Sequence, residues 1–103
     1  MQVEEIKEKI TPALIKHKIS RAGVFGSMAT GLADSESDID LLVEFSEKIS
    51  LLEFVRIKFE LEEILGKQVD LVEYQAIKPR LLPRILSEEI RIHESEENSI
   101  HNF

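Results

Sequence analysis

Apolar residues recur at helical spacing near the beginning of the chain. They predict a helix over residues 2–18, with charged residues at most of the remaining positions. The apolar stripe of this helix consists of Val3, Ile6, Ile10 and Leu14. Pro12 falls inside it, so either the helix is kinked there or Thr11 caps a second helix. We favour one kinked helix, because the stripe continues in phase across Pro12.

A second helical pattern covers residues 50–65. Ser50 and Glu53 have the spacing of a capping box, in which each side chain satisfies a free backbone amide, and Gly66 is placed to end the helix. The predicted buried stripe consists of Leu51, Phe54, Ile57, Leu61 and Ile64. A last, shorter helix is predicted over residues 79–89, because proline is favoured in the first turn of a helix.

Three segments have the apolar and β-branched composition of strands, and they cover residues 21–25, 39–45 and 69–73. The predicted order is helix, strand, glycine turn, strand, helix, strand, helix. This order indicates an α/β (α+β) fold, with a small mixed sheet of about three strands and helices packed on one face. For 103 residues we expect a single domain, residues 1–103, in which residues 93–103 form a flexible tail.

Composition and charge exclude several classes of protein. The hydrophobic fraction of 43% is too high for disorder, and no apolar run approaches the ~18 residues that cross a bilayer. The absence of cysteine excludes disulfides and thiolate metal sites, and it agrees with a cytoplasmic location. The net charge of −7 disfavours direct nucleic-acid binding. A small ligand with its own cation, or a basic protein partner, suits this charge better.

Aspartate is rare in the chain, and its positions are unusual. Only four of the 20 acidic residues are aspartates, and three of them lie in or beside predicted strands, where aspartate is unfavourable. Asp38 and Asp40 are two residues apart, so both side chains should point to the same face of a strand. If the strand that carries Asp70 lies alongside, it adds a third carboxylate to the same place.

Such a group of carboxylates predicts a metal site. Like charges at this separation repel unless a cation compensates them, and carboxylate oxygens are the ligands that Mg²⁺ and Mn²⁺ prefer. Three carboxylates with two metal ions are typical of phosphoryl and nucleotidyl transfer. The alternative is that paired aspartates at a strand entrance only cap a turn.

Two other kinds of metal site do not fit the sequence. Residues 34–39 begin like a calcium loop, but Ile39 occupies the required glycine position and Phe45 the position of the bidentate glutamate. The histidines lack the spacing of zinc ligands; they are His17, His93 and His101.

A glycine-containing turn follows the first predicted strand. Backbone amides in this turn and the Ser27 hydroxyl could receive phosphate oxygens, which makes Gly26 and Ser27 candidate nucleotide-binding residues. The spacing from Gly26 to Gly31 matches a Walker-A loop, but Leu32 and Ala33 stand where lysine and serine or threonine are required. The alternative is a tight corner without a ligand.

In combination, these residues resemble the nucleotidyltransferases of the DNA polymerase β superfamily, whose signature is Gly-Ser, then Asp-x-Asp, then a later aspartate on a strand. In particular, the chain resembles the minimal nucleotidyltransferases, which are the antitoxin halves of HEPN–MNT toxin–antitoxin pairs. Residues 25–31, 37–43 and 69–72 carry the likeness, and it extends from the first helix to about Ile92. The resemblance implies a polymerase β-like fold.

The resemblance also implies a role for each candidate residue. Gly26 and Ser27 would hold the nucleotide phosphates, Asp38 and Asp40 would bind two Mg²⁺ or Mn²⁺ ions, and Asp70 would complete one metal site and help to activate the acceptor hydroxyl. The implied reaction transfers AMP from ATP to a tyrosine hydroxyl of a cognate HEPN ribonuclease toxin, with pyrophosphate leaving. The toxin, or a homo-oligomer of this chain, would complete the acceptor site.

One position departs from the family pattern. Members often carry arginine where Thr30 stands, and its loss predicts weaker nucleotide binding or slower turnover. Two alternatives therefore stay open: an antitoxin that neutralises its partner by binding alone, and nucleotidyl transfer to RNA or a small molecule. The presence of all three aspartates and of Gly-Ser argues against the first, and the net charge argues against the second.

Overall fold

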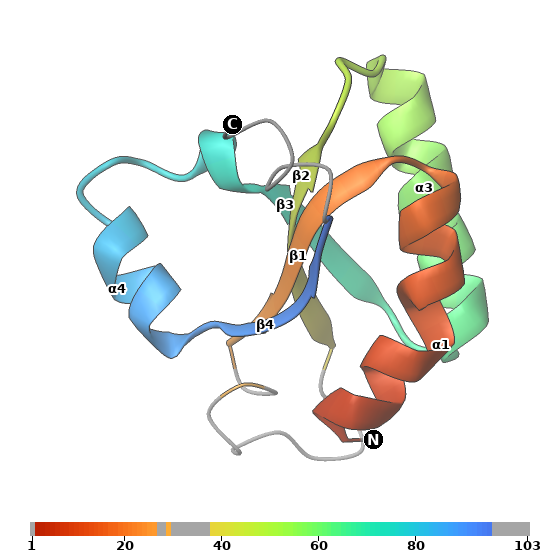
Figure 1. Cartoon of the computed structure of the whole chain (residues 1–103), viewed down its shortest axis with the longest axis horizontal. Coiled ribbons are helices and arrows are strands. Elements are labelled where there is room, and N and C mark those ends of the chain that lie inside the picture. Colours follow the sequence, from red (N-terminus) through yellow and green to blue (C-terminus); the bar gives the residue numbers. More distant parts are fainter. Residues whose placement is uncertain (1, 27–28, 30–37, 96–103) are drawn as a thin grey trace.

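The computed structural model describes residues 2–26, 29 and 38–95. Two helices and a mixed sheet form the body of the molecule, and a third helix stands apart from them (Figure 1). The elements, in chain order, are α1 (Val3–Lys16), β1 (Ile19–Phe25), β2 (Ile39–Phe45), α3 (Leu51–Leu65), β3 (Val69–Glu73), the 3₁₀ helix η1 (Tyr74–Ala76), α4 (Leu82–Glu88) and β4 (Ile90–Glu94).

Within the described residues the sheet has four strands in the order β3-β2-β1-β4. Strand β1 lies at the centre and pairs antiparallel with both β2 and β4, whereas β2 and β3 run parallel. The predicted strands at residues 39–45 and 69–73 are confirmed at both ends, and β1 begins two residues earlier than predicted. The α/β fold with a mixed sheet is therefore confirmed.

The described sheet has one strand more than the three that the sequence pattern located, because β4 is a fourth. This strand is short, and of its five residues only Ile92 is buried, so its sequence pattern is weak. It pairs with β1 as far as Glu94, so the predicted flexible tail beginning at residue 93 overlaps an ordered strand. Residues 96–103 lie outside the part of the chain that the structure describes.

The hydrophobic core lies between one face of the sheet and the helices α1 and α3. All four residues of the predicted α1 stripe face this core, and α1 is one continuous helix through Pro12, as predicted. In α3 the core-facing residues include Ile57 and Leu61, but Leu51 is 78% exposed and Leu65 is buried in its place. Leu51 is the first residue of α3, and the contacts of this helix with the core begin at Phe54.

The ends of α3 have the predicted chemistry. The Ser50 side chain accepts a hydrogen bond of 3.1 Å from the backbone amide of Glu53, which is one half of a capping box. Gly66 ends the helix in the left-handed region, with a φ of 68°. These local signals determine where α3 begins and ends.

Helix α4 differs from α1 and α3. It lies on the other side of the sheet, begins at Leu82 rather than at Pro79, and contains no buried residue (Figure 1). The prediction that helices pack on one face thus holds for α1 and α3 only. Among the described helices, none is long and apolar enough to cross a membrane.

Candidate active site

Asp40 and Asp70 lie side by side on the face of the sheet that α1 and α3 leave uncovered. They are direct partners in the parallel pairing of β2 with β3, in which neighbouring strands are about 4.8 Å apart. Ile39 and Leu41, which flank Asp40 in β2, are fully buried in the core on the opposite face. The alternation along β2 therefore turns Asp40 away from the core.

Asp38 stands immediately before β2 and is exposed. Its charge reaches Asp40: partial burial of Asp40, then the charge of Asp70, then that of Asp38 raise the pKa of the Asp40 carboxyl above its ordinary value of 3.8. The three aspartates thus form one electrostatic unit around Asp40. In the absence of a cation, ionised Asp40 is unfavourable in this position.

Gly26 lies against the Asp40 carboxylate at the end of β1. Its φ of +70° is in the left-handed region, and a Cβ atom there would collide with the Asp40 Oδ2 atom. Phe25, the preceding residue, is the partner of Asp40 across the antiparallel pair of β1 with β2. Glycine at position 26 therefore allows the turn to approach the carboxylates closely. Ser27, the other candidate of this turn, lies outside the described residues.

The predicted metal site consists of Asp38, Asp40 and Asp70, and all three lie in the described part of the chain. In residues 2–26, 29 and 38–95, no group of three histidine, aspartate or glutamate side chains is arranged to hold a metal ion as it stands. The donor set nevertheless fits a hard divalent cation, because it consists of carboxylate oxygens, and because burial together with the charges of Asp70 and Asp38 raises the pKa of Asp40. Metal binding by Asp38, Asp40 and Asp70 stays a prediction.

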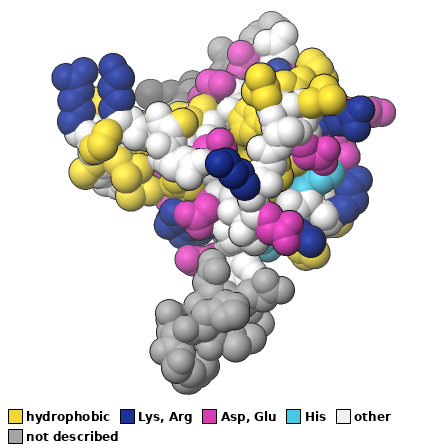
Figure 2. All heavy atoms as spheres, turned by 90° about the horizontal axis from the view of Figure 1, so that it is seen from above, with side chains coloured by type: hydrophobic (Ala, Val, Ile, Leu, Met, Phe, Trp, Pro, Cys, Tyr) yellow, Lys and Arg dark blue, Asp and Glu magenta, His cyan; other side chains and the backbone are white. Residues whose placement is uncertain are grey.

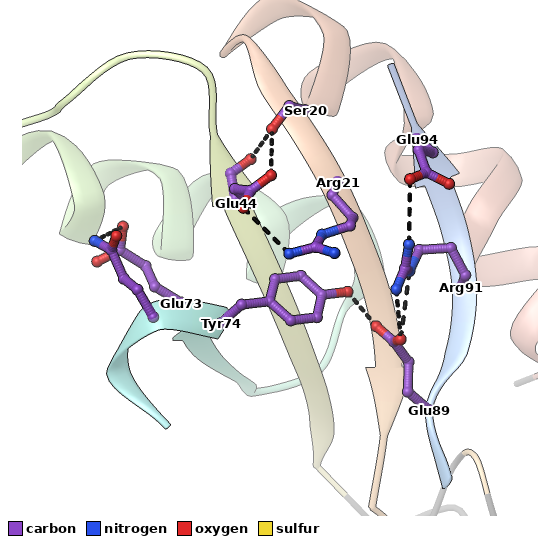
Figure 3. A network of polar contacts seen from close by, with 9 residues as sticks. Ser20, Arg21, Glu44, Glu73, Tyr74, Glu89, Arg91 and Glu94 are labelled. Carbon is purple, nitrogen blue, oxygen red and sulfur yellow. Dashed lines mark hydrogen bonds and ion pairs between the residues drawn. The ribbon is translucent and has the colours of Figure 1, made fainter. Parts of the chain in front are cut away.

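A second polar cluster lies on the same face of the sheet, farther from Gly26 (Figure 3). At its centre the Tyr74 hydroxyl donates a hydrogen bond to the Glu89 carboxylate, and Arg91 forms an ion pair of 3.0 Å with the same group. The guanidinium of Arg21 lies 4.2 Å from the centre of the Tyr74 ring and pairs with Glu44 at 3.1 Å. These residues link β1, β2, η1, β4 and the end of α4.

The side chain of Glu89 is buried in this cluster, with only 4% of it exposed. It occupies the space above Gly23, where any Cβ atom would collide with its carboxylate. Burial and the hydrogen bond to Glu89 raise the pKa of the Tyr74 hydroxyl, so Tyr74 stays protonated and keeps donating at neutral pH. Sequence reasoning missed this cluster. The only signal was a glycine in the middle of β1, at Gly23.

The opposite end of the sheet has a different character. The described residues there line an open hollow of about 650 Å³, between the end of α1 and the ends of β1, β2 and β4. Lys18, Glu47 and His93 contribute polar groups to it, but none of the predicted site residues does. The hollow is therefore separate from the carboxylates.

Comparison with known proteins assigns the chain to a family. The family model described as "Polymerase beta, Nucleotidyltransferase" matches residues 8–98. A protein of Methanocaldococcus jannaschii that is named as a protein adenylyltransferase is 52% identical over 92 residues, which cover 89% of this chain and 99% of the relative. The chain therefore belongs to the polymerase β nucleotidyltransferase family.

Comparison with solved structures shows which kind of nucleotidyltransferase the chain resembles. A structure described as a minimal nucleotidyltransferase is 40% identical, with a TM-score of 0.75 over 87% of this chain and 95% of the other. The MNT antitoxin–HEPN toxin complex of Shewanella oneidensis, in which the toxin is tri-AMPylated, contains a chain that is 18% identical. It matches with a TM-score of 0.70 over 93% of this chain and 76% of the other, and it shows a shared fold. The predicted class, a minimal nucleotidyltransferase related to protein adenylyltransferases, is confirmed.

Proposed function

We propose that this protein is an antitoxin that transfers AMP from ATP to a tyrosine hydroxyl of a cognate HEPN toxin. The observation that carries the proposal is the position of Asp40 beside Asp70, with Gly26 against Asp40, in a fold of the nucleotidyltransferase family. The Methanocaldococcus relative is named for adenylyl transfer to protein, and the Shewanella complex contains a HEPN toxin that carries AMP. Both support the same acceptor class for this chain.

In this proposal each residue of the site has one task. Gly26 leaves room for the triphosphate beside the carboxylates, and Ser27 donates its hydroxyl to a phosphate oxygen. Asp38, Asp40 and Asp70 hold the divalent cations, Mg²⁺ or Mn²⁺. When bound, such ions neutralise the charge on the triphosphate and on the leaving pyrophosphate. The raised pKa of Asp40 in the apo chain is the reason to expect that the site takes up cations.

The proposed reaction is a single displacement at phosphorus. The oxygen of the acceptor tyrosine forms a bond to the α-phosphorus of ATP, and the bond from that phosphorus to the bridging oxygen of the β-phosphate breaks. Pyrophosphate leaves, and the hydroxyl proton passes to Asp70 or to water. Asp70 suits this task because it is the exposed member of the Asp40–Asp70 pair.

The test is transfer of label from ATP to the toxin. The purified chain is incubated with its cognate HEPN protein, Mg²⁺ and α-labelled ATP, and the site of modification is found by tandem mass spectrometry. We expect labelled tyrosine with the wild-type chain, and no label with Asp38→Ala or Asp40→Ala. Full labelling by both variants would contradict the proposal.

Other outcomes would support the alternatives. If an Asp38→Ala/Asp40→Ala double variant still neutralises the toxin in cells, the protein acts by occupying its partner. If label appears on tRNA or on a small acceptor but not on protein, the acceptor class is wrong. A cytoplasmic location, where an intracellular toxin would be met, belongs to the same proposal.

A further inference from the structure

Helix α4 and the residues before it form an exposed surface without a partner in the described structure. No residue of α4 is buried, and three large apolar side chains remain open to solvent: Leu81 at 44%, Leu86 at 37% and Ile90 at 40% exposure. We call these residues, together with Lys78, Arg80 and Arg84, the α4 surface. A helix normally buries an apolar stripe, so one that does not is a candidate interface.

The charge of the α4 surface is opposite to that of the whole molecule. Residues 77–86 contain three basic and no acidic side chains, in a chain with a net charge of −7. Lys78 and Arg80 have no ion pair with any described residue, and the Arg84 side chain is 82% exposed, with only Glu88 of the same helix near it at 3.8 Å. Figure 2 shows basic and hydrophobic side chains gathered at the end of the molecule where α4 lies in Figure 1.

The α4 surface is held in place although it is not buried. Glu89 follows α4 directly, and its carboxylate is fixed on the sheet by Tyr74 and Arg91. Because a buried charge with two hydrogen-bonding partners is costly to release, this contact anchors the end of α4. The helix is thus presented to solvent at a defined position.

That position is beside the carboxylates. Ile90, the first residue of β4, pairs with Val24 in β1, and the next residue of β1, Phe25, pairs with Asp40. Glu89 and Asp40 also lie on the same face of the sheet, since Glu89 covers Gly23, the partner of Leu42, two residues along β2. A protein that docks on the α4 surface would therefore lie near the end of β2 that carries Asp40.

We propose that the α4 surface is the docking site for the acceptor protein, and that it binds an acidic and apolar surface of the HEPN toxin. This inference rests on the proposed function for the identity of the partner. The basic groups of the α4 surface would attract acidic groups of the partner locally, although the chain as a whole is acidic, and Leu81 and Leu86 would supply the apolar contact. The apolar residues on the outer side of α3 lie on the other side of the sheet and do not take part.

The experiment measures binding separately from transfer. Complex formation with the cognate HEPN protein is measured by titration calorimetry in an Asp40→Asn background, so that no modification occurs. The test variant is Arg80→Glu/Leu81→Ser. The matched control is Arg56→Glu/Leu52→Ser, which makes the same changes at exposed positions of α3. We expect at least a ~10-fold loss of affinity for the test variant and less than a ~2-fold change for the control.

A second measurement does not depend on variants. Hydrogen exchange of the complex should show protection of residues 77–90 on binding, with no change in residues 51–60. Wild-type affinity for the test variant, or an equal loss in the control, would overturn the proposal, as would protection confined to α3. Binding of the α4 surface to RNA instead of the toxin would also overturn it.

The outcomes separate this inference from the proposed function. If the toxin binds through the α4 surface but receives no AMP, docking is right and the proposed reaction is wrong. If AMP is transferred and the test variant binds and transfers as well as the wild type, the reaction is right and the docking site lies elsewhere.

Discussion

At Gly26 the backbone passes so close to the Asp40 carboxylate that no side chain fits between them. The left-handed φ explains why the turn favours glycine, and the missing Cβ explains how the turn comes so close to Asp40. Gly66 has nearly the same φ, +68°, but a Cβ atom there would meet nothing within 4 Å. Substituting Gly66 therefore strains the backbone alone, whereas substituting Gly26 strains the backbone and also disturbs Asp40.

Replacing each glycine by alanine tests this distinction. Gly26→Ala and Gly66→Ala should each lower the free energy of unfolding by about 1 kcal/mol, because both place alanine in the left-handed region. Only Gly26→Ala also displaces Asp40, so its rate of AMP transfer should fall by roughly 10²-fold. Thermal unfolding and initial rates of labelling measure the two effects. An unchanged rate in Gly26→Ala would show that Asp40 does not depend on the turn.

Asp40→Asn should stabilise the metal-free protein at neutral pH. Because the fold raises the pKa of Asp40, the ionised carboxylate costs stability, and the cost grows as the pH rises from 3.8 through the folded pKa. We expect a gain of about 1 kcal/mol or less, since the group is partly solvated. Urea unfolding in EDTA between pH 7 and pH 3.8 should show the gain shrinking as the pH falls.

The control for this experiment is Glu63→Gln, which removes one exposed negative charge from α3. It should change stability little at any pH in the range. If Asp40→Asn destabilises the metal-free chain at pH 7, the proposed repulsion between the aspartates is absent.

At the scale of elements, the helices are held by two different means. Helix α3 is fixed by its own ends and its core stripe, which are local features of the sequence. Helix α4 is fixed by Glu89, whose partners Tyr74 and Arg91 come from η1 and β4. Loss of one cap should therefore loosen α3, and loss of the Tyr74 hydroxyl should loosen α4.

Tyr74→Phe and Ser50→Ala test this separation. Tyr74→Phe removes a donor to a buried carboxylate and should cost about 1–2 kcal/mol, while Ser50→Ala removes a helix cap and should cost about 1 kcal/mol. Hydrogen exchange should become faster in residues 82–90 in the first variant, and in the first turn of α3 in the second. Equal loosening of both helices in either variant would show that α4 is not anchored through Glu89.

At the scale of the whole molecule, the two faces of the sheet serve different purposes. One face is covered by α1 and α3 and supplies the core, and the other carries the aspartates and the Tyr74–Glu89 cluster. Since the charges of Asp38 and Asp70 disfavour ionised Asp40 in the metal-free protein, the proposed function would be in conflict with stability on the second face. A cation that binds only the folded chain should resolve this conflict.

Divalent metal should therefore raise the melting temperature of the wild-type chain. Binding to the native state alone stabilises by mass action, by about 2.7 kcal/mol when the metal concentration is 100 times its Kd. Mg²⁺ or Mn²⁺ at millimolar concentration should produce the shift, and NaCl of equal ionic strength should not. The Asp38→Asn/Asp40→Asn variant should lose it. Identical shifts in variant and wild type would place the cations elsewhere.

Local signals account for the parts of the fold that were predicted correctly. The alternation of apolar residues in β2 and β3, the stripe of α1 and the glycine at the end of α3 each depend on neighbours within a few residues. Strand β4 was missed because its pairing with β1 joins residues about 70 positions apart, and because the strand is short, with only Ile90 and Ile92 as apolar residues. The exposure of Leu51 was missed because helical spacing alone does not tell where a helix leaves the sheet.

By itself the sequence determined the helices, three of the strands, the face to which Asp40 points and the family to which the chain belongs, because periodicity and motif spacing are properties of short segments. Only the tertiary structure decided that Asp40 pairs with Asp70, that Glu89 is buried on Gly23 between Tyr74 and Arg91, and that α4 is left exposed. These features depend on strand order and register, which long-range packing selects.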